Sequence, residues 1–135
     1  MKAKMAGYWT TTGLLALGLI GGGAAELSRY RPTVVGIEHL GYPVYFITII
    51  AAWKVLGGMA LLVPGFARLK EWAYAGVFFV MTGAAMSHVI RHDPAWHIFV
   101  TLGFAALAVA SWALRPASRT LGILFAANAR GGERI

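Results

Sequence analysis

No cysteine occurs among the 135 residues of the chain. Its absence excludes disulfide bonds, thiolate nucleophiles and every metal or iron–sulfur site that depends on cysteine ligands. Acidic residues are also scarce, with five aspartates and glutamates against twelve lysines and arginines. Nucleotide-binding motifs and the serine-hydrolase elbow are missing as well. Any redox role therefore needs a bound cofactor or a quinone-like ligand.

Apolar residues dominate what is present. They make up 59% of the chain, and the mean hydropathy is +0.67, whereas soluble domains are about 45–50% apolar. A chain this short cannot bury so much apolar surface in a water-soluble core. The net charge of +7 comes from basic residues at the ends of apolar runs, which is typical of membrane topology signals. We therefore expect a lipid bilayer as partner and no nucleic acid.

Four apolar segments, at 7–25, 42–63, 71–90 and 95–114, match the length of a membrane-crossing helix, which needs about 20 residues. They predict an all-α fold, a four-transmembrane-helix bundle in one domain over residues 1–116. The remaining residues, 117–135, are predicted to form a cytoplasmic interfacial segment and tail.

Turn and capping residues mark the predicted helix boundaries. The Arg-Pro pair at 31–32 is expected to end the first membrane-crossing part of the chain. Pro43 is expected in the first turn of the second helix. Asp93 is expected as the N-cap of the fourth helix, with Pro94 as its first residue. Glu71 is expected in the first turn of the third helix, where a carboxylate stabilises the macrodipole.

The distribution of positive charge predicts the orientation. Eight lysines and arginines fall on the side of the two termini, and three fall on the other side. Because basic residues are enriched on the cytoplasmic side, both termini are expected there, in a multi-pass inner-membrane protein. A cleaved signal peptide is the alternative for the first segment. Its apolar run exceeds the usual 7–15 residues, and the Ala-Ala-Glu sequence at 24–26 is a poor cleavage site, so we expect the segment to be retained.

Lys54 lies near the middle of the second apolar run. A charge at bilayer depth costs at least ~2.5–3.5 kcal/mol, so it usually faces the protein interior. Small residues at Ala51, Gly57 and Gly58 share its helix face. Two interpretations remain open: a structural ion pair with Glu26 or another acid, and a functional group that is either a ligand-facing cation or a neutral base.

Two further polar positions follow small residues at helical spacing. Gly18, Gly22 and Glu26 are each four residues apart, which predicts that Glu26 faces protein. The alternative is that Glu26 only ends the first helix among the lipid headgroups. In the third segment, Ser87 and His88 end a similar face of small residues.

All four histidines fall on the side opposite the termini. We take this as an indication of an outward-opening polar pocket that binds a small lipophilic molecule. The predicted catalytic residues are Glu26, Lys54 and His88. The predicted ligand-binding residues are Glu38, His39, Ser87, His92 and His97.

Metal and haem sites have weaker support. The spacing of His88 and His92 suits a metal pair on a helix, but the neighbouring Arg91 disfavours a cation. Bis-histidine haem ligation through His39 or His88 with His97 is conceivable, but no motif requires it. We therefore predict no metal site and favour a quinone over haem.

Four sequence blocks carry a family resemblance: HLGYP at 39–43, WKVLG at 53–57, LKEWAYAG at 69–76 and GAAMSH at 83–88. With them, about residues 7–114 resemble the DoxX-like family of small four-helix bacterial membrane proteins. The resemblance implies a four-helix membrane fold. It also implies an association with a thiosulfate:quinone oxidoreductase, known for founding members, or an accessory or chaperone role, known for other relatives. It carries over no catalytic residue.

Three classes of function follow. The first is an oxidoreductase, or its membrane subunit, that binds a lipophilic molecule such as a quinone. The second is a non-catalytic membrane protein that stabilises a partner complex or forms a homo-oligomer. The third is a transporter, which ranks last because four helices are few and no inverted repeat is visible. The sequence does not decide whether the chain is an enzyme.

Overall fold

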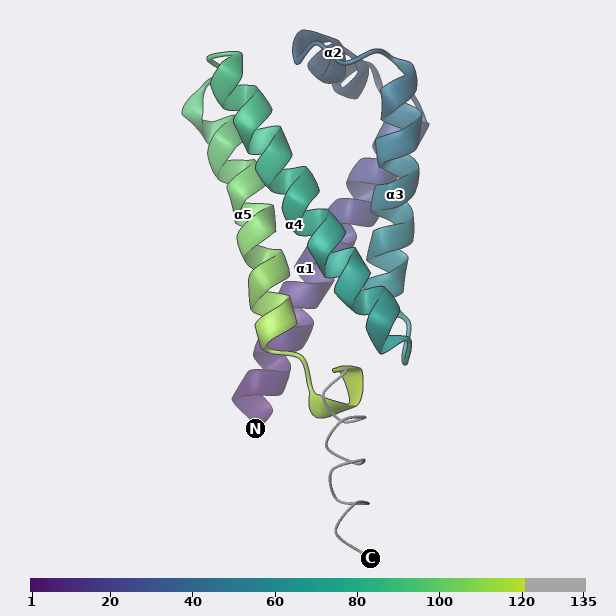
Figure 1. Ribbon diagram of the computed structural model, residues 1–135, viewed down its shortest axis with the longest axis vertical. Helices are drawn as coiled ribbons and strands as arrows, with labels where there is room; N and C mark the ends of the chain where they lie inside the picture. The colour runs from purple at the N-terminus through teal and green to yellow at the C-terminus, as the bar shows by residue number, and fades with distance from the viewer. Residues whose placement is uncertain (121–135) are drawn as a thin grey trace, which may run out of the picture.

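The computed structural model describes residues 1–120, and these form helices with no strand among them (Figure 1). The predicted all-α fold class is confirmed. Of the predicted C-terminal segment, only its first residues are described, and 121–135 lie outside the described part. The helices are α1 (Lys2–Leu27), α2 (Arg31–His39), α3 (Tyr45–Leu62), α4 (Ala67–Ile90), α5 (Ala95–Ala113) and a 3-10 turn η1 (Ala117–Arg119).

Three helices, α3, α4 and α5, are long and apolar enough to cross a membrane. Only 22%, 17% and 17% of their apolar stretches are buried inside the protein. Most of their apolar side chains therefore face outward, an arrangement that lipid stabilises and water does not. Helix α1 is the longest, with 26 residues, but it is not one of these three.

The four long helices form a ring in which neighbours run antiparallel (Figure 1). α1 packs mainly against α3, and α4 packs mainly against α5; contacts of α1 with α5 and of α3 with α4 close the ring. The two pairs cross near the middle and diverge toward the end where α2 lies. We call this the α2 end, and we call the opposite end, with the N-terminus, the 63–66 turn and η1, the terminal end.

Glycine allows the close approach of α1 and α3. A Cβ atom on Gly23 would lie 2.9 Å from the carbonyl oxygen of Ala51 and 2.7 Å from a methyl carbon of Val55. No side chain fits at that position, so the two helix backbones are in contact there. This contact lies close to Glu26, one turn further along α1.

The terminal end has a packed core with a bonded polar network. Ser111 Oγ lies 2.6 Å from Thr12 Oγ1 and 2.7 Å from the Tyr74 hydroxyl, and all three residues are buried. Lys70 is also buried, and its ammonium donates to the carbonyl oxygens of Ala60 and Val63 at the end of α3. These bonds satisfy polar groups that would otherwise be buried without partners.

Several boundary predictions were wrong. The Arg-Pro pair at 31–32 begins α2, because a proline fits a first helical turn, where its missing N–H is not needed. Pro43 lies before α3, which begins at Tyr45. Pro94 is the N-cap residue of α5, and the Asp93 side chain bonds to histidines instead of capping the helix.

Glu71 is a further correction. Helix α4 begins at Ala67, so Glu71 lies in its second turn, outside the first turn where the macrodipole acts. Its carboxylate instead pairs with the Arg115 guanidinium and accepts a hydrogen bond of 2.9 Å from Trp112 Nε1. It therefore joins α4 to the end of α5.

Candidate functional site

A cavity of about 370 Å³ lies between α2 and the diverging helices. Ile37 and Leu40, from α2 and its C-cap, form part of its wall, and Phe46 and Ile50 of α3 and Phe79 of α4 add apolar surface. We call this cavity the chamber. A mostly apolar wall with a few polar groups is typical of small-molecule sites. The polar residues that line it are Glu26, Tyr42, Lys54, Ser87, His88 and Thr101.

Glu26 and Lys54 form an ion pair in the chamber wall. Lys54 Nζ lies 2.7 Å from Glu26 Oε1, and the two side chains are 16% and 14% exposed. Gly22 makes room for the ammonium, because a Cβ atom there would lie 3.2 Å from Lys54 Nζ. Pairing lowers the cost of placing both charges among apolar helices.

The pair is incompletely bonded. Glu26 Oε2 is buried and has no hydrogen-bond partner within the described residues. An ammonium carries three N–H donors, and among residues 1–120 Lys54 donates one hydrogen bond, to Glu26. An unsatisfied buried carboxylate oxygen is costly, so the site favours a small polar group that donates a hydrogen bond.

This geometry bears on the two interpretations of Lys54. The structural ion pair with Glu26 is present, and both of its members also line a cavity large enough for a ligand. Glu26 lies one residue before the end of α1, and its side chain is 14% exposed and lines the chamber. It does not simply end the helix on the outside.

A second polar group, the Asp93 clasp, consists of Asp93, His39 and His88. Asp93 Oδ1 lies 2.5 Å from His39 Nε2, and Asp93 Oδ2 lies 2.6 Å from His88 Nδ1. The hydrogen bonds from His88 and then from His39 hold the pKa of the Asp93 carboxyl below its ordinary value. The carboxylate is therefore charged at neutral pH. The clasp ties the end of α2 to the end of α4, beside the chamber.

Aromatic stacking extends from the clasp. The His97 ring stacks on His88, with 4.9 Å between ring centroids, and on Trp96, with 3.6 Å between centroids. This stacking orients the ring of His88, and His88 also lines the chamber. His97 therefore supports the wall without being part of it.

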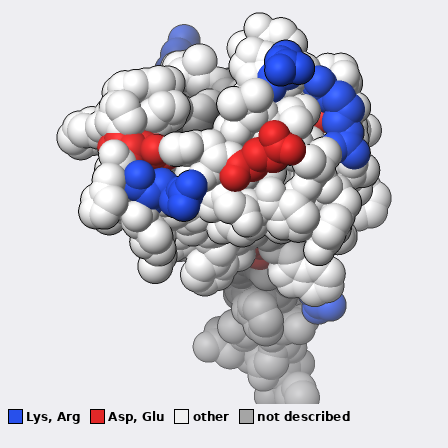
Figure 2. All heavy atoms as spheres, turned by 90° about the horizontal axis from the view of Figure 1, so that it is seen from above, with Lys and Arg blue, Asp and Glu red and all other residues white. Residues whose placement is uncertain are grey.

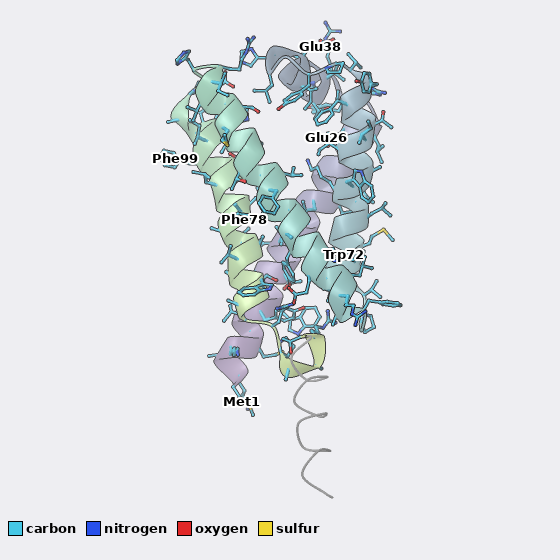
Figure 3. All side chains as sticks on the ribbon, in the orientation of Figure 1. Met1, Glu26, Glu38, Trp72, Phe78 and Phe99 are labelled. Atoms are coloured by element: carbon cyan, nitrogen blue, oxygen red, sulfur yellow. The ribbon has the colours of Figure 1, made fainter. Side chains whose placement is uncertain are left out.

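The structure brings together half of the predicted site residues. Glu26, Lys54, Ser87 and His88 line the chamber, while His39, half exposed, and His97 lie at its margin. The other two lie apart from it. Glu38 is exposed on α2 (Figure 3), and His92 follows the C-cap of α4 with a left-handed backbone, so the helical spacing to His88 does not apply to it.

Two of the polar lining residues, Tyr42 and Thr101, were not predicted. The Tyr42 hydroxyl lies 3.0 Å from Ser87 Oγ and joins the turn before α3 to α4. Because tyrosines are enriched at membrane–water interfaces, an aromatic residue at the start of an apolar run does not by itself indicate a cavity. Thr101 is a lone polar residue one turn after His97, and that spacing is the signal that would have placed both on one face of α5.

Residues that could ligate a metal do not converge in the part of the chain that the structure describes. Within residues 1–120, no group of three or more histidine, aspartate or glutamate side chains is placed to hold a metal ion. His39 and His88 each direct a ring nitrogen toward Asp93 instead.

At the α2 end, charges of both signs are interspersed among uncharged side chains, as Figure 2 shows. In that view a run of basic side chains follows one edge of the molecule.

Comparison with known protein families matches residues 10–111 to the DoxX-like family. The match covers most of the chain and includes every residue of the chamber and of the Asp93 clasp. The resemblance carried by the four sequence blocks is thereby confirmed. No curated protein and no solved structure matches the chain.

Proposed function

The chain belongs to the DoxX-like family of membrane proteins, and we propose that it binds a small lipophilic molecule, with a quinone as the first candidate, in the chamber at its α2 end. In this proposal Lys54 and Glu26 contact the polar head of the molecule. His88 and Ser87 complete the polar wall, and the apolar residues surround the ring.

The proposal includes a topology. Residues 1–116 form one membrane domain in which α1 crosses the bilayer together with α3, α4 and α5. The positive charge on the side of the termini supports a cytoplasmic terminal end and an inner-membrane location. The chamber then opens outward. The ion pair with Lys54 supports the placement of α1 in the membrane, since it compensates the charge of Glu26.

The observation that carries the proposal is the unpartnered Glu26 Oε2 in the wall of a mostly apolar cavity. A purely structural ion pair is stable when every polar atom is bonded. Within the described residues, Glu26 Oε2 and two N–H groups of the Lys54 ammonium have no hydrogen-bond partner. They are therefore available to a ligand. A quinone carbonyl accepts from an ammonium, and a quinol hydroxyl donates to a carboxylate, so the pair matches both forms.

The same site suits an oxidoreductase and a non-catalytic membrane subunit of one. In either case Lys54 orients an oxygen of the bound molecule, and Glu26 accepts a proton or a hydrogen bond from it. Binding is therefore the property to test first.

The test uses the purified protein in lipid nanodiscs titrated with decylubiquinone, with binding followed by equilibrium partition against empty nanodiscs. We expect saturable binding that the double variant Glu26→Gln/Lys54→Gln weakens at least tenfold. Changing both partners leaves no unpaired charge, so the fold is retained. Lys4→Gln, at an exposed position of α1, is the matched control. Equal binding to the protein and to empty nanodiscs would refute the proposal.

A second candidate is a non-catalytic protein that stabilises a membrane partner or a second copy of itself. Gly13 and Gly21 favour it, because both are exposed on α1 and no atom of the described residues lies within 4 Å of a Cβ placed there. Small residues on an outer helix face allow another helix to approach. Under this alternative, Gly21→Leu abolishes a defined complex on native gels, whereas the chamber variant leaves that complex intact.

A further inference from the structure

A second cavity, of about 290 Å³, lies on the outer side of the contact between α3 and α4. We call it the α3–α4 groove. Its lining is almost wholly apolar and includes the indoles of Trp53 and Trp72, which are 68% and 75% exposed. It extends to Ala60 and Leu69, near the terminal ends of the two helices.

The groove meets the chamber at Lys54. Four residues line both cavities: Ile50 and Lys54 of α3, and Val80 and Met81 of α4. The apolar groove on the outside therefore leads to the only ammonium in the chamber wall among the described residues. A molecule with a polar head and an apolar tail would match this change in polarity along its length.

Two glycines keep the groove open. Gly57 and Gly76 line it, and a Cβ atom at either position meets nothing within 4 Å. The neighbouring Gly58 differs, since a Cβ there would lie 2.7 Å from an Ile20 side-chain carbon. Gly58 thus serves helix packing, whereas no described residue fills the space over Gly57 and Gly76.

We propose that the α3–α4 groove holds the tail of a single-chain amphiphile whose uncharged, hydroxyl-bearing head reaches Glu26 and Lys54. This inference rests on the proposed function, because the head occupies the chamber. The hydroxyl donates to the unpartnered Glu26 Oε2, and its oxygen accepts from Lys54. An anionic head fits less well, because Glu26 already balances the charge of Lys54.

The experiment uses a long-chain alkylphenol that carries a photoreactive diazirine in its tail, added to the full-length protein in nanodiscs. After irradiation, peptide mass spectrometry locates the labelled residues. We expect saturable labelling of the groove around Trp53 and Trp72. Gly57→Leu and Gly76→Leu fill the groove and should lower this labelling at least fivefold.

Gly103→Leu is the matched control, because Gly103 is exposed on α5 with equally free space and lies outside both cavities. It should leave the labelling unchanged. The methyl ether of the probe cannot donate to Glu26, so its saturable labelling should be several times weaker. Equal labelling by phenol and ether would overturn the assignment of the head.

A tail-less phenol separates this inference from the proposed function, since it reports on the chamber alone. If it binds both the protein and Gly57→Leu, while the long probe labels all outer helix faces without saturation, the inference is wrong and the proposed function stands. If the tail-less phenol does not bind at all, both are wrong. Saturable groove labelling that Gly57→Leu removes, with phenol binding retained, supports the inference.

Discussion

Polar side chains are buried at both ends of the helix bundle, but the two ends use them differently. At the terminal end, Ser111 and Lys70 are bonded to partners on neighbouring helices and lie in a packed core. At the α2 end, Glu26 and Lys54 bond to each other beside an open chamber, and one carboxylate oxygen has no partner within the described residues.

The difference has a geometric cause. The helix pairs α1/α3 and α4/α5 cross and diverge toward the α2 end (Figure 1), so side chains can fill the space at one end only. Where the helices are close, the Ser111 hydroxyl and the Lys70 ammonium bond to partners on neighbouring helices. Where they diverge, partners are out of reach and a cavity remains. One bundle therefore combines a packed end with an end that holds the chamber, which we propose as the ligand site.

The largest expected effect is at Lys70. Lys70→Met removes the donor to the Ala60 and Val63 carbonyls and leaves both without that bond in a buried setting. We expect the free energy of unfolding to fall by about 2–4 kcal/mol, measured by denaturant titration in detergent micelles. Arg68→Met, at an exposed position two residues earlier, is the control. If both variants lose the same stability, the terminal end is not the stabilising end.

A serine pair compares the two ends directly. Ser111→Ala removes the shared partner of Thr12 and Tyr74 and should cost about 1–3 kcal/mol of unfolding free energy. Ser87→Ala loses a 3.0 Å bond to Tyr42 beside the chamber and should cost less than about 0.5 kcal/mol. The same unfolding titration measures both variants. Equal costs would contradict the contrast between a packed end and an open end.

The ion pair should contribute little to stability. The double variant Glu26→Gln/Lys54→Gln removes both charges, so the unfolding free energy should change by less than about 1 kcal/mol. Its decylubiquinone affinity should nevertheless fall at least tenfold. A loss of stability like that of Lys70→Met would instead show that the pair has a structural role, and the contrast between the ends would then fail.

The smallest expected effect is local opening at the Asp93 clasp. The pKa of Asp93 is held below its ordinary value in the folded state. The Asp93 carboxylate therefore stabilises the clasp fully at pH values above that ordinary pKa. This stabilisation is lost as the pH falls through the lower folded-state pKa. Acidification should therefore lower the protection factors of the α2 amides, measured by hydrogen exchange against the intrinsic rate at each pH, while those of α4 and α5 stay high.

At neutral pH, Asp93→Asn should produce the same local opening, because the amide lacks the charge that His39 and His88 bond to. Glu38→Gln, on the exposed face of α2, is the control and should leave exchange unchanged. Unfolding of the whole bundle in Asp93→Asn would mean that the clasp stabilises more than α2.

Much of the fold follows from properties that the sequence states directly. Apolar runs of bilayer length predict long helices, since backbone groups in lipid must bond within their own helix. A lysine within such a run requires a partner or a cavity, and the structure provides both for Lys54. The small-residue spacing before Glu26 likewise indicated which face of α1 lies against the protein.

The pairings depended on the tertiary structure. Glu26 meets Lys54 across 28 residues, and His39 meets Asp93 across 54. Such distances along the chain are bridged by the angle at which helices cross, which no local pattern specifies. For the same reason Glu71 was assigned to a helix dipole and Asp93 to a helix cap, whereas both bond to other helices. The sequence therefore required that the buried charges be compensated, and the packing of the helices decided by which groups and beside which cavity.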